Sequence, residues 1–489
     1  MILTIRNVIC LGGGICMSER FLDAKLCEIE INGMKNVLHG ELVFQNINGL
    51  IRNSEEGYRY NHVTGMYGNN GSGKSTVVQT MSFLRDLIAK DYFLPEGRKK
   101  RLASQHRLLI NAKKNMTENR FLVFLKKEAE TVFLEYSVRI EKCGEQYLIF
   151  HEKVRRKAKE EGKSWEAWKI MLEYDRALDE IRVDGRKLKK TGILFTKLMA
   201  YQEQREKSDD LKSFFFDDSA YDLINESCAK NVQDTLCDLL EFINYDLLTL
   251  EYDQFSETDH WVLPIMVRLP NNYGHIQGML PIIMRPGEKQ FVPALLYSVV
   301  VNVFFQIHTV LKTIIPDLDI GLKNIEQVVD KNGDDGYSFE VMSSRNGVEI
   351  PLIHESLGIK KIIFMINMLV DCYNDPRINL FIDEMDSGVF EHLLGQLVEA
   401  FDQKAKGFLF FTAHNLRPLE KINYKELYFT TTDPENRYAK LSIVGNNNPR
   451  NVYFHDLNLG RPKGADFAEV PSVSQIKLGF MKAGKTRNG

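Results

Sequence analysis

A glycine-rich stretch at residues 63–76 constrains the fold of this chain more than any other part of the sequence. It reads Val-Thr-Gly-Met-Tyr-Gly-Asn-Asn-Gly-Ser-Gly-Lys-Ser-Thr and fits the phosphate-loop pattern of a glycine, four residues and Gly-Lys-Ser. The apolar residues before the loop predict a buried strand, and residues 76–88 predict a helix. A glycine-rich turn without a ligand would match the same letters, but the flanking strand and helix favour a nucleotide-binding loop.

The loop offers three kinds of contact to a nucleotide. Its glycines let the backbone approach phosphate oxygens, and the amides that start the helix point at the anion. Lys74 places a positive charge within reach of the β- and γ-phosphates, and the Ser75 hydroxyl is a ligand for Mg²⁺. We therefore predict ATP and Mg²⁺ as cofactors, with contacts from Gly68, Asn69, Asn70, Gly71, Ser72, Gly73, Lys74, Ser75 and Thr76.

The acidic partner of the loop is predicted at the end of a second buried strand, in the run Asn-Leu-Phe-Ile-Asp-Glu at residues 379–384. Asp383 would hold Mg²⁺ directly or through water. Glu384 would face the γ-phosphate and orient or deprotonate the attacking water. A solvated strand end is the alternative for such a run in isolation, but the intact phosphate loop favours a catalytic pair.

Two further segments carry candidate site residues. Residues 355–361 read Glu-Ser-Leu-Gly-Ile-Lys-Lys before an apolar helix, so Ser356 and Gly358 offer a hydroxyl and free amides to an anion. A serine at this position also serves as an ordinary helix cap. His414 follows an apolar strand predicted at residues 408–412, where it could reach a γ-phosphate, although a lone histidine after a strand is more often structural.

The order of these four motifs resembles that of the ABC/SMC-type ATPases, which include RecF and the OLD-family proteins. Within that group the chain looks most like the AAA15-type bacterial ATPases, many of which belong to anti-phage and abortive-infection systems. The resemblance rests on residues 355–358 and on the Asp-Glu-Met-Asp-Ser-Gly run at 383–388, and it covers roughly residues 24–145 and 320–445. The signature departs from the family, because it reads Ser-Leu-Gly-Ile-Lys where Ser-Gly-Gly-Gln is usual.

The resemblance implies a role for each motif. Ser356 and Gly358 would touch ATP bound to an opposing subunit, and Asp386 would lie in the subunit-contact loop. His414 matches the switch histidine. The implied catalytic residues are Glu384, Lys74 and His414, and the implied magnesium residues are Ser75 and Asp383.

The predicted fold class is an α/β P-loop NTPase of ABC/SMC-like type, a mixed sheet with flanking helices interrupted by a mainly helical insertion. Lys74 and Asp383 must converge on one Mg²⁺ although the chain between them is long, so the chain leaves the core and returns. The many charged residues at 152–163 predict one helix of the insertion. The Asn-Gly pairs at 32–33 and 346–347 predict β-hairpins. The predicted divisions are an extension at 1–22, core at 23–149, insertion at 150–319, core at 320–465 and a basic tail at 466–489.

Composition indicates a soluble globular chain. The net charge is −3, with 44% apolar and 26% charged residues, so the overall charge favours neither nucleic acid nor membrane as a partner. Seven cysteines form no C-x-x-C pair, which suits a reducing cytosol. The apolar stretch at 291–315 is interrupted by polar residues, so we expect a buried helix rather than a membrane span, and a cytoplasmic location.

Two functions remain open from the sequence. In the first, the chain is a sensor or scaffold ATPase of an anti-phage system, of PARIS-like arrangement, that forms homo-oligomers and controls a separate effector protein. About 75 residues follow His414, which is short for an effector domain. The alternative is a RecF/SMC-like ATPase of DNA repair or maintenance. The basic run from Arg98 to Lys114 favours nucleic-acid contact, although such runs are more often solvated surface.

Overall fold

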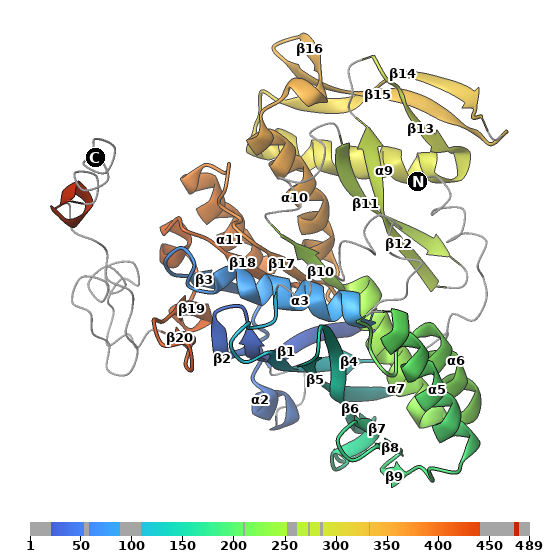
Figure 1. Ribbon diagram of the computed structural model, residues 1–489. Helices are drawn as coiled ribbons and strands as arrows, with labels where there is room; N and C mark the ends of the chain where they lie inside the picture. The colour runs from blue at the N-terminus through green and yellow to red at the C-terminus, as the bar shows by residue number, and fades with distance from the viewer. Residues whose placement is uncertain are drawn as a thin grey trace, which may run out of the picture.

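The computed structural model describes residues 21–52, 58–88, 109–208, 211–251, 262–271, 274–283, 287–331, 333–440 and 474–478. The predicted N-terminal extension up to residue 20, residues 98–108 of the basic run from Arg98 to Lys114, and most of the predicted tail lie outside these residues. Two large sheets lie side by side, and helices cover the outer face of the second sheet (Figure 1).

The first sheet has eight antiparallel strands in the order β2-β1-β4-β5-β6-β7-β8-β9. Its inner face packs into a core shared with the helix that follows the phosphate loop. Sequence neighbours pair with sequence neighbours through most of the sheet, which short turns allow only for antiparallel strands. The strands are β1 Asp23–Met34, β2 Val37–Val43, β4 Met116–Lys126, β5 Glu130–Cys143, β6 Gln146–Glu160, β7 Lys169–Asp175, β8 Glu180–Val183 and β9 Arg186–Lys187.

The prediction of a helix at residues 152–163 is wrong, because the segment up to Glu160 is part of strand β6 and a turn follows it. Alternate side chains such as Val154 and Ala158 are buried against the core. The charges between them have cross-strand partners: Arg155 donates from Nε and Nη2 to the Glu135 carboxylate at 2.7 and 2.6 Å. Strand propensity depends on packing against neighbouring strands. A helix prediction based only on the local charged composition therefore failed for this segment.

The second sheet has six strands in the order β10-β17-β18-β3-β19-β20, and all except the antiparallel β20 run parallel to their neighbours. The parallel strands are buried along their whole length, as sequence runs such as Phe-Leu-Phe-Phe predicted. Helix α3 (Lys74–Ile88) packs between this sheet and the first one. The strands are β10 Leu247–Leu250, β17 Asn379–Ile382, β18 Phe408–Thr412, β3 Val63–Tyr67, β19 Leu427–Thr430 and β20 Tyr438–Lys440.

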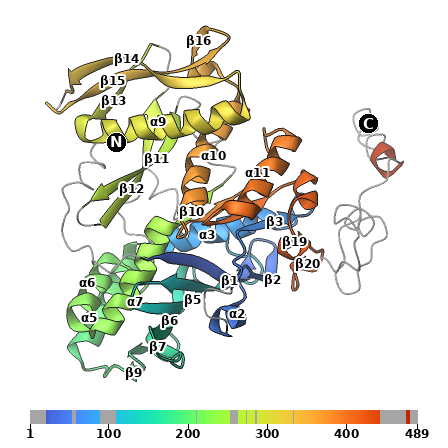
Figure 2. The same cartoon turned by 180° about the vertical axis from the view of Figure 1, so that it is seen from behind.

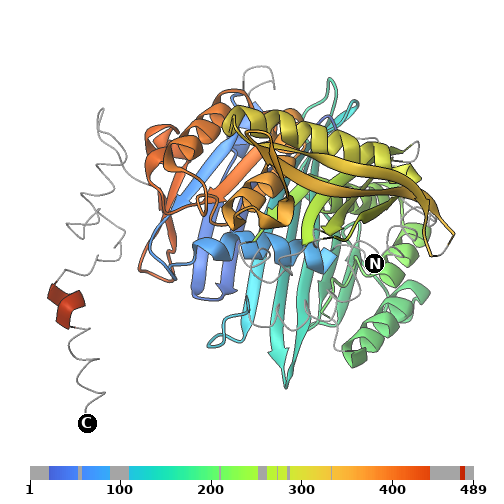
Figure 3. The same cartoon turned by 90° about the horizontal axis from the view of Figure 1, so that it is seen from above.

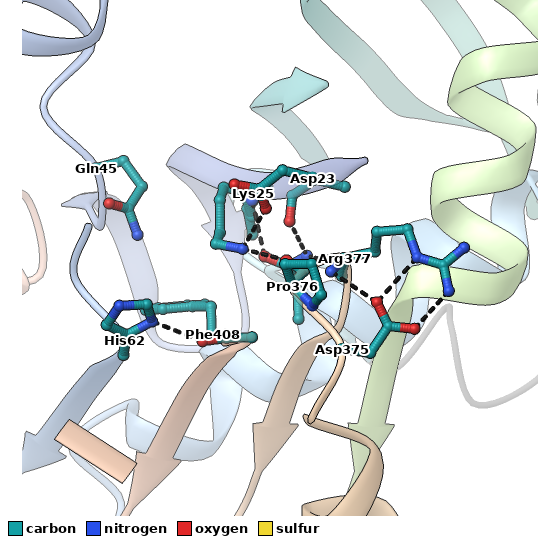
Figure 4. Close-up of polar contacts among 12 residues, drawn as sticks. Asp23, Lys25, Gln45, His62, Asp375, Pro376, Arg377 and Phe408 are labelled. Atoms are coloured by element: carbon teal, nitrogen blue, oxygen red, sulfur yellow. Dashed lines mark hydrogen bonds and ion pairs between the residues drawn. The ribbon is translucent and has the colours of Figure 1, made fainter. Parts of the chain in front are cut away.

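The two sheets are joined where β17 begins. The Asn379 side chain accepts from the amide of Leu26 at 2.8 Å and donates to the carbonyl of Ala24 at 3.0 Å, so it substitutes for a strand neighbour of β1. Beside it, the fully buried Lys25 ammonium donates to Asp23 and to the carbonyl of Pro376 (Figure 4). This junction lies at the opposite end of the parallel strands from the phosphate loop, and it fixes the loop's sheet against the first sheet.

The range 150–319 is mixed rather than mainly helical, because it includes the strands from β6 to β13 as well as helices. A four-stranded sheet and the helix α9 form the upper part of the molecule, and α10 and α11 cover the parallel sheet (Figures 1 and 2). The remaining elements are α2 Ile47–Arg52, α5 Ile193–Ser208, α6 Asp218–Ser227, α7 Lys230–Glu241, β11 Val262–Asn271, β12 Gly274–Ile283, β13 Gln290–Pro293, α9 Ala294–Ile314, β14 Asp319–Val329, β15 Asp335–Arg345, β16 Val348–Pro351, α10 Leu357–Asn374 and α11 Glu391–Lys404.

Helix α9 is half-buried rather than buried. Leu296, Val300 and Ile307 face the core, but Leu295 and Phe305 on the other side are 61% and 69% exposed. Figure 3 shows the helix lying along the β14–β15 hairpin. Among the described residues α9 is the one helix whose length and composition would allow a membrane span, a test that core helices of soluble proteins also pass.

Both predicted hairpins form, and one turns three residues later than predicted. Residues 346–347 join β15 and β16 as a two-residue turn. In the first hairpin Met34 pairs with Val37, so the turn residues are Lys35 and Asn36, and Lys35 takes a positive φ of 48°. The mixed second sheet, the phosphate loop between β3 and α3 and the flanking helices confirm the predicted α/β P-loop fold, whereas the predicted mainly helical insertion is wrong.

Candidate functional site

The phosphate loop lies between β3 and α3, at the carboxyl ends of the parallel strands. Because β3 has β18 on one side and β19 on the other, both neighbours end beside the loop. Gly68 has a φ of +150°, and a Cβ atom there would lie 1.8 Å from Thr430 Oγ1. Thr430 Oγ1 in turn lies 2.6 Å from Ser72 Oγ, so the end of β19 supports the loop and requires glycine at residue 68.

The Lys74 ammonium is folded over the loop. Its Nζ donates to the carbonyls of Gly68 at 2.7 Å and Asn69 at 2.9 Å. Burial lowers the pKa of Lys74, while the nearby Asp383 and Glu384 carboxylates raise it. An anion at the loop can therefore replace neutral carbonyl partners with a charged one, which gives a stronger hydrogen bond.

A threonine fixes the acidic pair at the end of β17. Thr412, the last residue of β18, donates from Oγ1 to Asp383 Oδ1 at 2.6 Å and accepts from the Glu384 amide at 2.8 Å. Glu384 has a φ of 48°, a region that few non-glycine residues adopt. Such strain persists only where the surroundings fix the backbone, and it is common at functional sites.

The segment after Glu384 is held from two sides. The Asp386 carboxylate accepts from the amides of His414 and Asn415, both at 2.8 Å. On the other side, Lys361 of α10 donates from Nζ to the Glu384 carbonyl at 2.6 Å. Burial lowers the pKa of Lys361 to about 8, against the opposing effect of the three nearby carboxylates.

A cavity of about 580 Å³ lies over the loop and brings most of the predicted site together. The loop from Asn70 to Thr76 lines one side of this cavity. Glu384 and His414, which follow the ends of β17 and β18, also line it. Gly68, Asn69 and His414 line an adjoining cavity of about 290 Å³. The residues lining the larger cavity are Lys35, Asn36, Asn70, Gly71, Ser72, Gly73, Lys74, Ser75, Thr76, Gln79, Glu384 and His414.

Ser356 and Gly358 do not line either cavity. Ser356 Oγ accepts from the Ile359 amide at 3.2 Å and caps α10, as the structural alternative predicted. Gly358 packs on the loop after Glu384, since a Cβ on Gly388 would lie 2.9 Å from the Gly358 Cα. Within one chain, the start of α10 therefore supports the acidic segment.

The donor set suits a hard cation. The Ser75 hydroxyl and the Asp383 carboxylate are oxygen ligands, and Mg²⁺ in nucleotide sites needs only one or two of these because phosphates and waters complete its shell. No group of three or more His, Cys, Asp or Glu residues that could hold a metal occurs among the described residues. Ser75 and Asp383 are thus the residues that would hold Mg²⁺.

The sequence prediction missed several residues of the site. Thr412 could have been found from the sequence, because it ends an apolar strand and lies two residues before His414. No sequence pattern pointed to Lys35 and Asn36, because they belong to the β1–β2 turn, which is distant from the phosphate loop in sequence. Gln79 lies in the helix after the loop, one turn beyond Ser75.

Comparisons with known proteins show only distant likenesses. No family model matches the chain, and no curated protein matches it. The head domain of Smc with an extended coiled coil, bound to the C-terminal domain of ScpA and derived from Pyrococcus furiosus, is 9% identical, with a TM-score of 0.38 over 86% of this chain and 96% of that one.

Two other solved structures are similar at the same level. The SMC head domain from Thermotoga maritima is 10% identical, with a TM-score of 0.32 over 86% of this chain and all of that one. The recombination mediator protein RecF with ATP, of the RecFOR pathway, is 11% identical, with a TM-score of 0.33 over 87% of this chain and all of that one. Likenesses this distant assign no activity to this chain, and the chemistry of the site follows from its own residues.

Proposed function

We propose that this chain is an ATP-binding and ATP-hydrolysing enzyme of ABC/SMC-like type. The observation that carries the proposal is the convergence of Lys74, Ser75 and Glu384 on one cavity, with Asp383 fixed beside Glu384 by Thr412. A phosphate loop, an acidic strand end and a carboxylate facing the same space are the parts that phosphoryl transfer to water requires.

The residues divide the chemistry among them. Lys74 exchanges the carbonyls of Gly68 and Asn69 for phosphate oxygens, and the α3 amides bind the same anion. Ser75 and Asp383 would hold Mg²⁺, which would supply positive charge to neutralise the phosphates. Glu384 accepts a proton from the attacking water, and its strained backbone keeps the carboxylate directed at the cavity.

His414 completes the site from the end of β18. Its side chain is exposed, and its amide is held by Asp386. The ring can therefore donate to a γ-phosphate while the backbone stays tied to the acidic segment. Loss of the γ-phosphate would release that contact. A movement of His414 could then pass through Asp386 to the segment after Glu384, which α10 also contacts.

A second chain would complete each site. The cavity over the loop is open, and the start of α10 lies outside it in the same chain. Leu357 and Phe390, which flank the Gly358–Gly388 contact, are 62% and 75% exposed. We infer that this surface meets the nucleotide of an opposing copy, with Ser356 and Gly358 facing the phosphates.

The proposed biological role is that of a cytoplasmic sensor or scaffold that controls a separate effector in anti-phage defence. The exposed apolar face of α9, with Leu295 and Phe305, supports a protein partner, because single-chain proteins seldom leave large apolar side chains together on one helix face in water. The test takes the product of the neighbouring gene as the candidate effector. It compares how much of this protein co-purifies with the wild-type chain and with the Leu295→Gln/Phe305→Gln double variant.

The matched control is Leu178→Gln, which changes an equally exposed leucine, 60% exposed, on another surface. We expect the partner to be lost with the double variant and retained with the control. The DNA-maintenance alternative predicts instead that the chain alone binds DNA tightly, and that this binding weakens steeply with salt.

ATP binding is tested separately with Lys74→Ala. We expect the substitution to abolish nucleotide binding in a titration, because the phosphates lose their cation. Unchanged affinity would contradict the assignment of the loop.

A further inference from the structure

Gln79 is a buried polar residue with no assigned role at the nucleotide site. It lies in α3 and is 8% exposed. Since residues four apart share one face of a helix, its side chain extends from the same face as Ser75. Both residues line the 580 Å³ cavity, together with Glu384.

The side-chain oxygen of Gln79 has no hydrogen-bond partner among the residues that the structure describes. Buried polar atoms are nearly always paired, so each exception in a folded protein requires an explanation. The neighbouring Thr80 shows how α3 usually solves this problem, since its hydroxyl donates to the Thr76 carbonyl at 2.6 Å. Gln79 Oε1 instead remains available to whatever occupies the cavity.

An acceptor one helical turn beyond the Ser75 hydroxyl suits a particular ligand. Mg²⁺ loses its waters reluctantly and keeps several of them in nucleotide sites. Those waters are strong donors, and acceptors around a metal's shell orient the groups bound to it. The oxygen of an amide accepts such a hydrogen bond without adding a second negative charge next to the phosphates.

We propose that Gln79 positions the magnesium ion of the nucleotide complex by accepting a hydrogen bond from a metal-bound water. The proposal rests on the proposed function, because it requires ATP and Mg²⁺ at this loop. Gln79 is a positioning residue that acts on the ion bound by Ser75 and Asp383, and it takes no part in proton transfer.

The test measures binding of a fluorescent ATP analogue with and without Mg²⁺. Met has the shape of Gln and lacks the acceptor, whereas Glu keeps an acceptor oxygen. For Gln79→Met we expect unchanged affinity without Mg²⁺ and an enhancement by Mg²⁺ that is about 3- to 10-fold smaller than in the wild type, the value of one ordinary hydrogen bond. Gln79→Glu should keep at least the wild-type enhancement.

Ser82→Ala is the matched control. Ser82 Oγ is also buried in α3 and has no hydrogen-bond partner within the described part of the chain, but Ser82 does not line the cavity. Its removal should leave the Mg²⁺ enhancement unchanged. Without nucleotide, the Gln79→Met protein should unfold at the wild-type temperature or above it, because the substitution removes an unpaired oxygen from the interior.

The outcomes separate this proposal from the proposed function. Wild-type enhancement by Mg²⁺ in Gln79→Met, or an equal loss in Gln79→Glu, would overturn the role of Gln79 and leave the ATPase assignment intact. Failure of the wild-type chain to bind the nucleotide at all would overturn both.

Discussion

Replacing Thr412 with Val tests how β18 holds the acidic pair. Valine has the shape of threonine, so the change removes the hydroxyl and little else. Two hydrogen bonds disappear: the one to the Asp383 carboxylate at 2.6 Å and the one from the Glu384 amide at 2.8 Å. Both partners are in a buried segment, and Asp383 is only 5% exposed.

The magnitude follows from the two partners that lose their bonds. A hydrogen bond to a charged group contributes about 1.5–3 kcal/mol, and a buried amide without a partner costs about 1–3 kcal/mol. The two losses share one hydroxyl, so we expect the free energy of unfolding to fall by about 3–4 kcal/mol. The released Glu384 backbone should also leave its strained conformation and displace the carboxylate, and such misplacement costs about 100-fold in turnover.

The assay pairs urea unfolding with phosphate release from ATP, and Thr412→Ser is the control. Serine keeps the hydroxyl and loses one methyl group, which costs about 1 kcal/mol. We expect Thr412→Ser to retain most of its turnover and Thr412→Val to lose nearly all of it. Equal stability and equal turnover of the two variants would refute the view that this hydroxyl positions Asp383 and Glu384.

Three other predictions concern the loop, α10 and the second subunit. Gly68→Ala should destabilise the chain and abolish nucleotide binding, because its Cβ would collide with Thr430. Gly71→Ala, whose Cβ would meet no atom of the described residues within 4 Å, should lower the free energy of unfolding only through backbone strain of about 1–2 kcal/mol. Between about pH 8 and 10.5 the free energy of unfolding of the wild type should rise relative to that of Lys361→Met, since the unfolded lysine holds its proton across this window and the buried one does not. Ser356→Arg should block hydrolysis but not ATP binding, and mixing it with Lys74→Ala should restore part of the activity, because each mixed dimer has one unmodified composite site. A mixture that stays inactive despite exchange of subunits would show that each chain hydrolyses ATP alone.

The phosphate loop and the parallel sheet were predictable because their signals are local. Glycine spacing defines the loop, and continuous apolar runs such as residues 378–382 and 408–412 mark strands buried on both faces. The structure places Lys74 and Glu384 at one cavity, while their catalytic roles stay predictions.

Other features depend on partners that are distant in sequence. Strand β6 is rich in charged residues, and only its pairing with β5 and β7 makes those charges compatible with a sheet. Lys361 was visible as one of two adjacent lysines, but its contact with the Glu384 carbonyl depends on how α10 packs. The half-exposed position of α9 likewise depends on its packing against β14 and β15, which no local sequence pattern predicts.

The most direct test of the account compares Glu384→Gln with the wild type and Lys74→Ala in ATP binding and phosphate release. Glutamine keeps the shape of glutamate but cannot accept the proton of the attacking water. We predict that Glu384→Gln binds ATP with wild-type affinity and releases phosphate at least 100-fold more slowly, in the range that general-base catalysis supplies, whereas Lys74→Ala binds none. Phosphate release by Glu384→Gln at the wild-type rate would contradict the account.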